Sequence, residues 1–186
     1  MKVIFTIISL LLLQACSTLG PVDTPQYMPM ISKASNVSEK EVILSSRASW
    51  MNFNVDHCWT NEAYMINCTK EQINNGFSSQ LLKGKKPNDS ILVLSENSVP
   101  FLDWDSNRRQ YINNTTLPVN DITTLERHQF GLSRLIRIGM NNTTKRYYIF
   151  TLMNDSAQMQ DSKKADKLFS HLRQKSAANG VQPVEF

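Results

Sequence analysis

Residues 131–153, GLSRLIRIGMNNTTKRYYIFTLM, decide the fold that this sequence predicts. Apolar residues fill two runs, Leu135–Ile138 and Tyr147–Leu152, and the polar stretch Asn141–Thr144 separates them. Two such runs joined by a short polar turn are typical of a β-hairpin. The sequence therefore predicts an antiparallel hairpin over this stretch.

A helical pattern follows the hairpin, over about 161–177. Its apolar residues recur three and four positions apart, as on one face of a helix, and they are Ala165, Leu168, Phe169 and Leu172. Asp161 stands at the start, where the helix dipole favours an acidic group, and Asn179-Gly180 is a typical helix end. The sequence predicts a helix packed through one face.

The residues before the hairpin predict a strand, a helix and a long loop. Ser90–Leu94 is a compact apolar run, typical of a buried strand. Residues 69–72, TKEQ, match a capping box, and the apolar stripe behind it predicts a helix over about 69–83. Residues 95–120 are rich in Asn, Asp, Ser and Pro, so we expect a loop with at most one short strand or hairpin.

Further toward the N-terminus, residues 41–48 begin the structured part, and alternating apolar residues over 51–55 predict a half-buried strand. We expect residues 63–68 to pair with it, through a connection at 59–62. Residues 17–40 contain three prolines and no periodicity, and they predict a flexible tether. The fold class expected is a single α+β domain, 41–186, with an antiparallel sheet built from hairpins and two packed helices.

Charge and composition exclude few functions. The formal net charge is +4, the basic residues are scattered apart from the cluster Lys83, Lys85 and Lys86, and we expect no nucleic-acid binding. The aromatic stretch 101–111 holds the candidate partner-binding residues, which are Trp104, Arg108, Arg109 and Tyr111. Adjacent arginines beside aromatic rings can bind carboxylate or phosphate groups.

Catalytic and metal motifs are weak. Residues 103–107, DWDSN, open like a calcium loop, but Arg108 and Asn114 stand where an EF-hand needs Gly and Glu. His128 and His171 are isolated in sequence, and the chain has no G-x-S-x-G nucleophile elbow. We expect no enzymatic activity, no metal and no cofactor; a cell-wall or lipid hydrolase is the enzyme alternative.

The first 16 residues have the layout of a secretory signal. Lys2 gives a positive start, residues 3–13 are largely apolar, and Ala15 precedes Cys16. The run is too short to span a bilayer. A cysteine directly after the expected cut resembles the lipobox of bacterial lipoproteins, apart from Gln14, where an apolar or small residue is usual.

The resemblance implies that residues 1–15 are removed and that Cys16 becomes a lipidated N-terminus, anchored in a membrane. Residues 16–40 would then be the lipidated end and its tether. Ser17 follows, where an Asp would favour retention at the inner membrane in enteric bacteria. We therefore expect an outer-membrane lipoprotein that faces the periplasm. An uncleaved signal anchor or an ordinary cleaved signal is the alternative.

With Cys16 carrying lipid, Cys58 and Cys68 remain as an even pair. In an oxidising periplasm a disulfide is the expected state of such a pair. A metal site that uses His57 with these two cysteines is the alternative, and it lacks a fourth ligand.

Anchoring at a membrane makes a binding role the expected function. The hypothesis is a non-enzymatic accessory component of an envelope, secretion, pilus or conjugation assembly, with a protein partner in the cell envelope. Its partner surface would be a sheet face, an exposed edge or the aromatic stretch at 101–111. The alternative is an immunity or inhibitor lipoprotein directed against a toxin or hydrolase that acts in the periplasm.

Overall fold

The computed structural model describes residues 20, 25–54, 58–60, 66–68, 88–130, 133–140, 146–155 and 159–185. The expected signal, Cys16 and the expected helix at 69–83 lie outside the described residues. The described strands are β1 (Leu44–Asn54), β2 (Cys58–Thr60), β3 (Ile66–Cys68), β4 (Asn88–Leu94), β5 (Ser98–Asp105), β6 (Gln110–Pro118), β7 (Ile122–Phe130), β8 (Ser133–Met140), β9 (Arg146–Met153) and β10 (Val184–Glu185). The helices are α2 (Met28–Ser35) and α5 (Ser162–Ala178), with short 3₁₀ turns η1 (Glu39–Glu41) and η2 (Val119–Asp121).

Eight strands form one sheet in the order β10-β7-β8-β9-β1-β4-β5-β6. All neighbours in it are antiparallel except β10, which pairs in parallel with β7. The expected hairpin at 131–153 is confirmed as β8 and β9, with Ile136 opposite Phe150. The α+β class and the antiparallel sheet are therefore as expected, although the sheet is larger than a set of hairpins.

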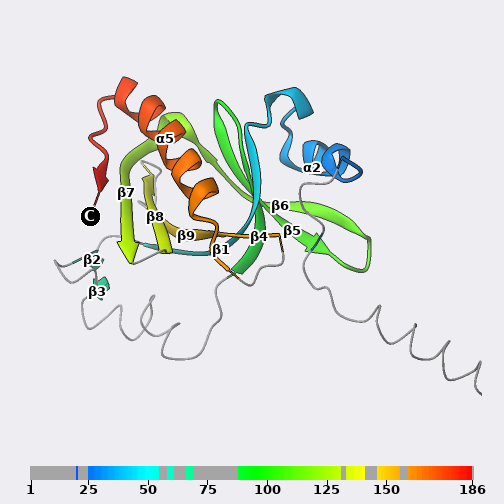
Figure 1. Ribbon diagram of the computed structural model, residues 1–186, viewed down its shortest axis with the longest axis horizontal. Helices are drawn as coiled ribbons and strands as arrows, with labels where there is room; N and C mark the ends of the chain where they lie inside the picture. Colours follow the sequence, from blue (N-terminus) through cyan, green and yellow to red (C-terminus); the bar gives the residue numbers. More distant parts are fainter. Residues whose placement is uncertain are drawn as a thin grey trace, which may run out of the picture.

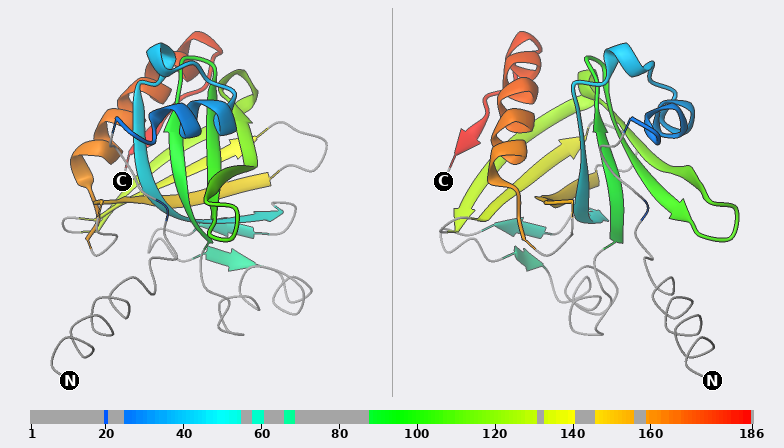
Figure 2. Two further views of the ribbon diagram at one scale, coloured as in Figure 1. Left: turned by 90° about the vertical axis from the view of Figure 1, so that its right-hand side faces the viewer. Right: turned by 45° about the vertical axis from the view of Figure 1, so that its right-hand side comes forward.

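Strand β1 joins the two halves of the sheet. Its central residues pair on one side with β9 and on the other with β4, so that Trp50 lies between Phe150 and Asn88. The main core contains buried side chains from both halves, including the fully buried Leu92, Phe101, Leu125 and Ile138. Figure 2 shows the strands of the two halves running in different directions around this core.

Helix α5 covers the main core, as its apolar stripe predicts. Ala165, Leu168, Phe169 and Leu172 are all buried, and the helix contacts β7, β8 and β9 (Figure 1). The carboxylate of Asp161 accepts a hydrogen bond of 3.0 Å from the Lys164 amide and caps the N-terminus. Such a cap stabilises a helix by about 1 kcal/mol.

The loop expected over 95–120 is wrong, because most of it is the long hairpin of β5 and β6. Its apolar residues Val99, Phe101, Leu102 and Leu117 are buried. Strand β6 lies at the sheet edge, and its residues 112–114 and 116 are exposed. A strand with one edge and one face in water has many polar residues, so its composition resembles that of a loop. This explains the wrong expectation.

The pairing expected for residues 63–68 is also wrong. Strand β3 pairs with β2, whereas β1 pairs with β4 and β9. Cys58 is the direct backbone partner of Cys68. Residues directly opposite in an antiparallel pair have Cα atoms about 4.5–5.5 Å apart, which is within the range that a disulfide spans. The disulfide itself stays a prediction, because these side chains are outside the described set.

A flexible tether is the wrong expectation for residues 28–35. They form α2, which packs on the outer face of the sheet through the fully buried Ile31. Figure 1 shows α2 beside β5 and β6, on the opposite side of the molecule from α5. Helix α2 has only eight residues and a proline near its start. So short a stretch has too few apolar positions to show a helical period in the sequence.

Candidate functional site

Trp104 and Tyr111 form an aromatic pair at the end of the β5–β6 hairpin. They are direct partners across the two strands, and their ring centroids are 4.9 Å apart. The turn between the strands is fixed by Asp105, whose Oδ1 accepts hydrogen bonds from the amides of Asn107 and Arg108 at 2.9 and 3.0 Å. The sequence motif that resembled a calcium loop therefore caps a turn.

Gly20 lies against this pair and has no room for a side chain. A Cβ atom there would come within 2.7 Å of Tyr111 Oη and 2.8 Å of Trp104 Cδ2. Real Cβ atoms do not approach other atoms so closely, because packed interiors tolerate little overlap. The aromatic pair therefore contacts the chain's own N-terminal part, four positions after Cys16.

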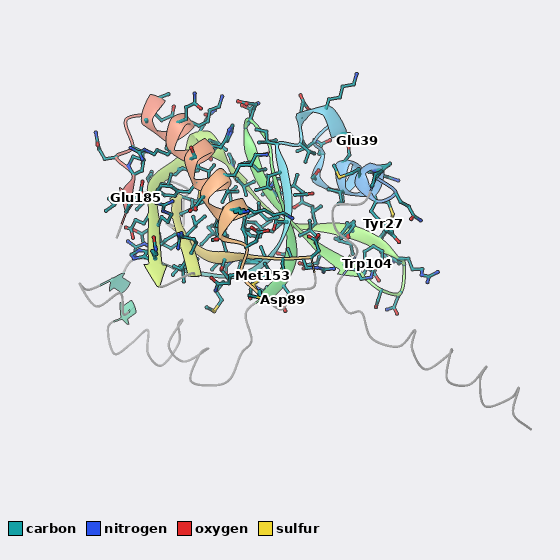
Figure 3. The ribbon with its side chains drawn as sticks, viewed as in Figure 1. Tyr27, Glu39, Asp89, Trp104, Met153 and Glu185 are labelled. Carbon is teal, nitrogen blue, oxygen red and sulfur yellow. The ribbon has the colours of Figure 1, made fainter. Side chains whose placement is uncertain are left out.

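Helix α2 packs against the same site. Ile31, Leu102 and Tyr111 belong to one buried cluster, with Met28, Met30 and Trp104 packed against it. Figure 3 labels Trp104 and Tyr27 on this side of the molecule. The site is a second, smaller core on the outer face of the sheet, made from the hairpin and the N-terminal residues.

The polar groups of this site adjust to burial. Burial raises the pKa of Tyr111, although the positive charge of Arg47 opposes the effect, so the phenol is neutral. Burial also lowers the pKa of Arg47, and its Nε donates to the carbonyl of Asp155 at 2.6 Å. A neutral phenol and a hydrogen-bonded guanidinium are compatible with burial between packed segments of the chain.

Arg108 and Arg109 lie on the turn itself, and both are exposed. The Arg108 side chain is 72% exposed, and its Nε is 3.7 Å from Asp105. Arg109 is exposed and adopts a left-handed backbone conformation with φ of 51°. The structure thus separates the four candidate residues into an inward aromatic pair and an outward cationic turn. Their role in binding a partner stays a prediction.

A buried charged cluster on β7 and β8 was not predicted from the sequence. Glu126 Oε2 lies 2.9 Å from His128 Nε2, and Arg137 donates to Glu126 Oε1. All three residues are no more than 7% exposed. The Arg137 guanidinium also stacks over Tyr147, 4.7 Å from the ring centre. Glu126 and His128, two ionisable residues spaced by two along β7, share a face, and that spacing was the available signal.

Hydrogen bonds within this cluster hold Glu126 ionised. Burial alone raises the pKa of Glu126, but the hydrogen bonds from His128 and Arg137 outweigh it, and the pKa lies below its ordinary value. A buried carboxylate with two donors is a stable structural anion. The arrangement ties β7 to β8.

The remaining chemical groups considered from the sequence lie apart. Asp103 accepts hydrogen bonds from Ser90 and Asn114, whereas His128 is on β7 and His171 is on α5, near Glu96. Among the residues that the structure describes, no three His, Cys, Asp or Glu side chains form a metal-binding group. Within the same residues, no helix is long and apolar enough to cross a membrane.

No family model matches this chain, and no curated protein matches it. Solved structures with a distant likeness include the hSac2 domain of the human phosphoinositide phosphatase Sac2, with 12% identity and a TM-score of 0.39, over 54% of this chain and 66% of that one. The Slm1-PH domain in complex with phosphoserine is 11% identical with a TM-score of 0.43, over 74% of this chain and 98% of that one. Another Slm1-PH structure, described as binding ligand in a non-canonical site, is 9% identical with a TM-score of 0.40, over 73% of this chain and 98% of that one. At these values the likeness assigns no family or ligand to this chain.

Proposed function

We propose that this chain is an outer-membrane lipoprotein, anchored through Cys16, whose periplasmic α+β domain is a non-enzymatic binding component of an envelope assembly. The anchor rests on the lipobox-like sequence that ends at Cys16. Gly20, four positions after that cysteine, packs against the domain. An anchor at Cys16 would therefore hold the domain close to the membrane.

The edge of β6 is the surface that best supports a protein partner. The other candidate surfaces were a sheet face and the aromatic stretch at 101–111. The outer face of β5 and β6 is covered by α2, and Tyr111 of the aromatic pair is buried against Gly20. Strand β6 is last in the strand order, and no other strand of the described chain pairs with its free edge. A free edge can accept an extended segment of another protein through main-chain hydrogen bonds.

The anchor is tested by changing the lipidated residue. We expect Cys16→Ala to abolish incorporation of labelled palmitate and to release the protein from the outer-membrane fraction or leave its signal uncut. Labelling and fractionation of cells that express wild type or variant measure this. A variant that still fractionated with the outer membrane would contradict the lipid anchor.

The partner surface is tested by Asn113→Lys on the free edge of β6, since an edge lysine discourages strand pairing. Asn113 is exposed, and its side-chain amide donates a hydrogen bond of 3.0 Å to Thr116 Oγ1. We expect pull-down from detergent-solubilised membranes to recover much less partner with this variant. Gln174→Lys on the exposed side of α5 is the matched control. Recovery of the wild type alone would count against a binding role, and recovery of a toxin or hydrolase would favour an immunity function.

A further inference from the structure

The lipid anchor and the folded domain are joined by a very short link. Gly20 is packed against Trp104 and Tyr111, and only three residues separate it from Cys16. Four Cα–Cα steps span at most about 14 Å. If Cys16 carries lipid, as the proposed function requires, the aromatic pair lies within that distance of the membrane surface.

The end of the β5–β6 hairpin lies close to the same aromatic pair. The turn starts directly after Asp105, one residue beyond Trp104, and each strand residue advances about 3.3 Å. No residue of the turn, 106–109, is more than three positions from Trp104 or Tyr111, which corresponds to about 10 Å. Figure 1 and Figure 2 show this hairpin projecting from the side of the molecule that carries α2, away from α5 and the C-terminus.

The turn presents positive charge outward and keeps its negative charge bonded to the chain. Arg108 and Arg109 are exposed. By contrast, the Asp105 side chain is 19% exposed and caps the turn, and Asp103 accepts hydrogen bonds from Ser90 and Asn114. Arginine side chains favour anionic lipid headgroups.

An apolar side chain accompanies these arginines. Ile112 is 43% exposed although it is large and hydrophobic, and it follows Tyr111 on β6. Cationic groups beside apolar and aromatic ones suit the boundary between headgroups and acyl chains. We propose that the end of the β5–β6 hairpin, residues 105–110, rests on the anionic surface of the membrane that holds Cys16, so that the domain has a fixed orientation there.

Fluorescence quenching at two positions tests this orientation. The lipidated protein is purified with Asn107→Cys, or with Gln174→Cys on α5, labelled with an environment-sensitive dye and placed in vesicles of phosphatidylcholine with phosphatidylglycerol. Both positions are exposed, and protein without an added cysteine gives the background. A nitroxide on the lipid headgroups reports contact. We expect strong quenching at position 107 and little at position 174.

Charge reversal then tests the role of the arginines. We expect the double change Arg108→Glu and Arg109→Glu to reduce quenching at position 107 about fivefold or more. Lys163→Glu, at an exposed position of α5, is the control and leaves the quenching unchanged. Labelled protein with both arginines intact, placed in vesicles of phosphatidylcholine alone, should show the same reduced quenching at position 107.

Two failures are distinguishable. If the protein floats with the vesicles but both dyes are equally unquenched, the anchor stands and the docked orientation is overturned. If the protein does not float, the lipid anchor is wrong, and the inference falls with it. Quenching at position 107 that is insensitive to charge reversal overturns the recognition of an anionic surface.

Discussion

At Gly20 the chain passes so close to an aromatic pair that a side chain would collide with it. Three atoms, Tyr111 Oη, Tyr111 Cε1 and Trp104 Cδ2, would be less than 3 Å from an added Cβ. A residue with no side chain therefore lets the chain at Gly20 approach the hairpin closely. No periodic pattern around Gly20 indicates this contact.

Replacement of Gly20 by Val tests this contact. We expect Gly20→Val to lower the free energy of unfolding by about 1–3 kcal/mol, because overpacking forces the aromatic pair or the N-terminal part to move. Urea denaturation of the mature domain measures the loss. Gln26→Val, at an exposed position of the same part of the chain, should change stability by no more than about 0.5 kcal/mol. Equal stability of the two variants would mean that Gly20 is not packed.

Glu126 carries the clearest dependence of stability on pH. Its pKa in the folded protein lies below the ordinary value of 4.5, despite burial, because His128 and Arg137 bond its carboxylate. A group with a depressed folded-state pKa stabilises the protein above its unfolded-state pKa. That stabilisation is lost as the pH falls through the folded-state pKa.

The variant Glu126→Gln should separate this effect from the rest of the molecule. We expect it to lower the free energy of unfolding near pH 7 by about 2–4 kcal/mol, because Arg137 stays buried without its charged partner. Between about pH 5 and pH 3 the variant should lose less stability than wild type. Urea denaturation across this range measures both, with exposed Glu39→Gln as the control. Parallel pH curves for wild type and Glu126→Gln would show that Glu126 does not contribute.

Among the secondary-structure elements, helix α5 can be predicted from its sequence, whereas helix α2 cannot. The stripe on α5 repeats over 17 residues and has a cap at Asp161, so its face and start are predictable. Helix α2 has 8 residues, fewer than an isolated helix needs to be stable. It exists because the sheet offers an apolar outer face on which Ile31 is fully buried.

Ile31→Ala distinguishes a packed helix from a tether. We expect a loss of about 2–4 kcal/mol, since a buried isoleucine is replaced by a cavity. The exposed neighbour Lys33 provides the control, and Lys33→Ala should leave stability within about 0.5 kcal/mol of wild type. Thermal or urea unfolding gives both values. A tether would tolerate the two changes equally.

Strand β6 is likewise an element that its own sequence does not predict. Asn113, Asn114 and Thr116 are exposed, while Tyr111 and Leu117 are buried. A strand at the sheet edge needs few apolar residues, so its composition predicts a loop. The proposed partner surface is this same edge, and it becomes recognisable only when the strand order is known.

For the whole molecule, the predicted disulfide between Cys58 and Cys68 bears on stability. The sequence predicts a disulfide, and the backbone places the two residues directly opposite each other in β2 and β3. Closing so short a loop should stabilise the fold by about 3 kcal/mol in the chain-entropy model. The proposed anchor at Cys16 does not depend on this predicted bond.

Accordingly, Cys58→Ser should lower the free energy of unfolding by about 2–4 kcal/mol while the protein stays in the membrane fraction. Unfolding with and without a reducing agent, together with fractionation, measures this. Reduction should destabilise the wild type and leave the variant unchanged. If reduction had no effect on the wild type, the cysteines would be unpaired, and the metal alternative with His57 would regain support.

The sequence by itself determined the β8–β9 hairpin, strand β4 and helix α5, because each has a local hydrophobic period that burial of one face demands. It also carries the only basis for the anchor at Cys16. Tertiary structure alone decided that β1 lies between β4 and β9, that polar residues form an edge strand, and that Glu126, His128 and Arg137 meet. It also decided that Gly20 packs against Trp104 and Tyr111. These are contacts between residues far apart in the chain, and they form only where distant surfaces fit together.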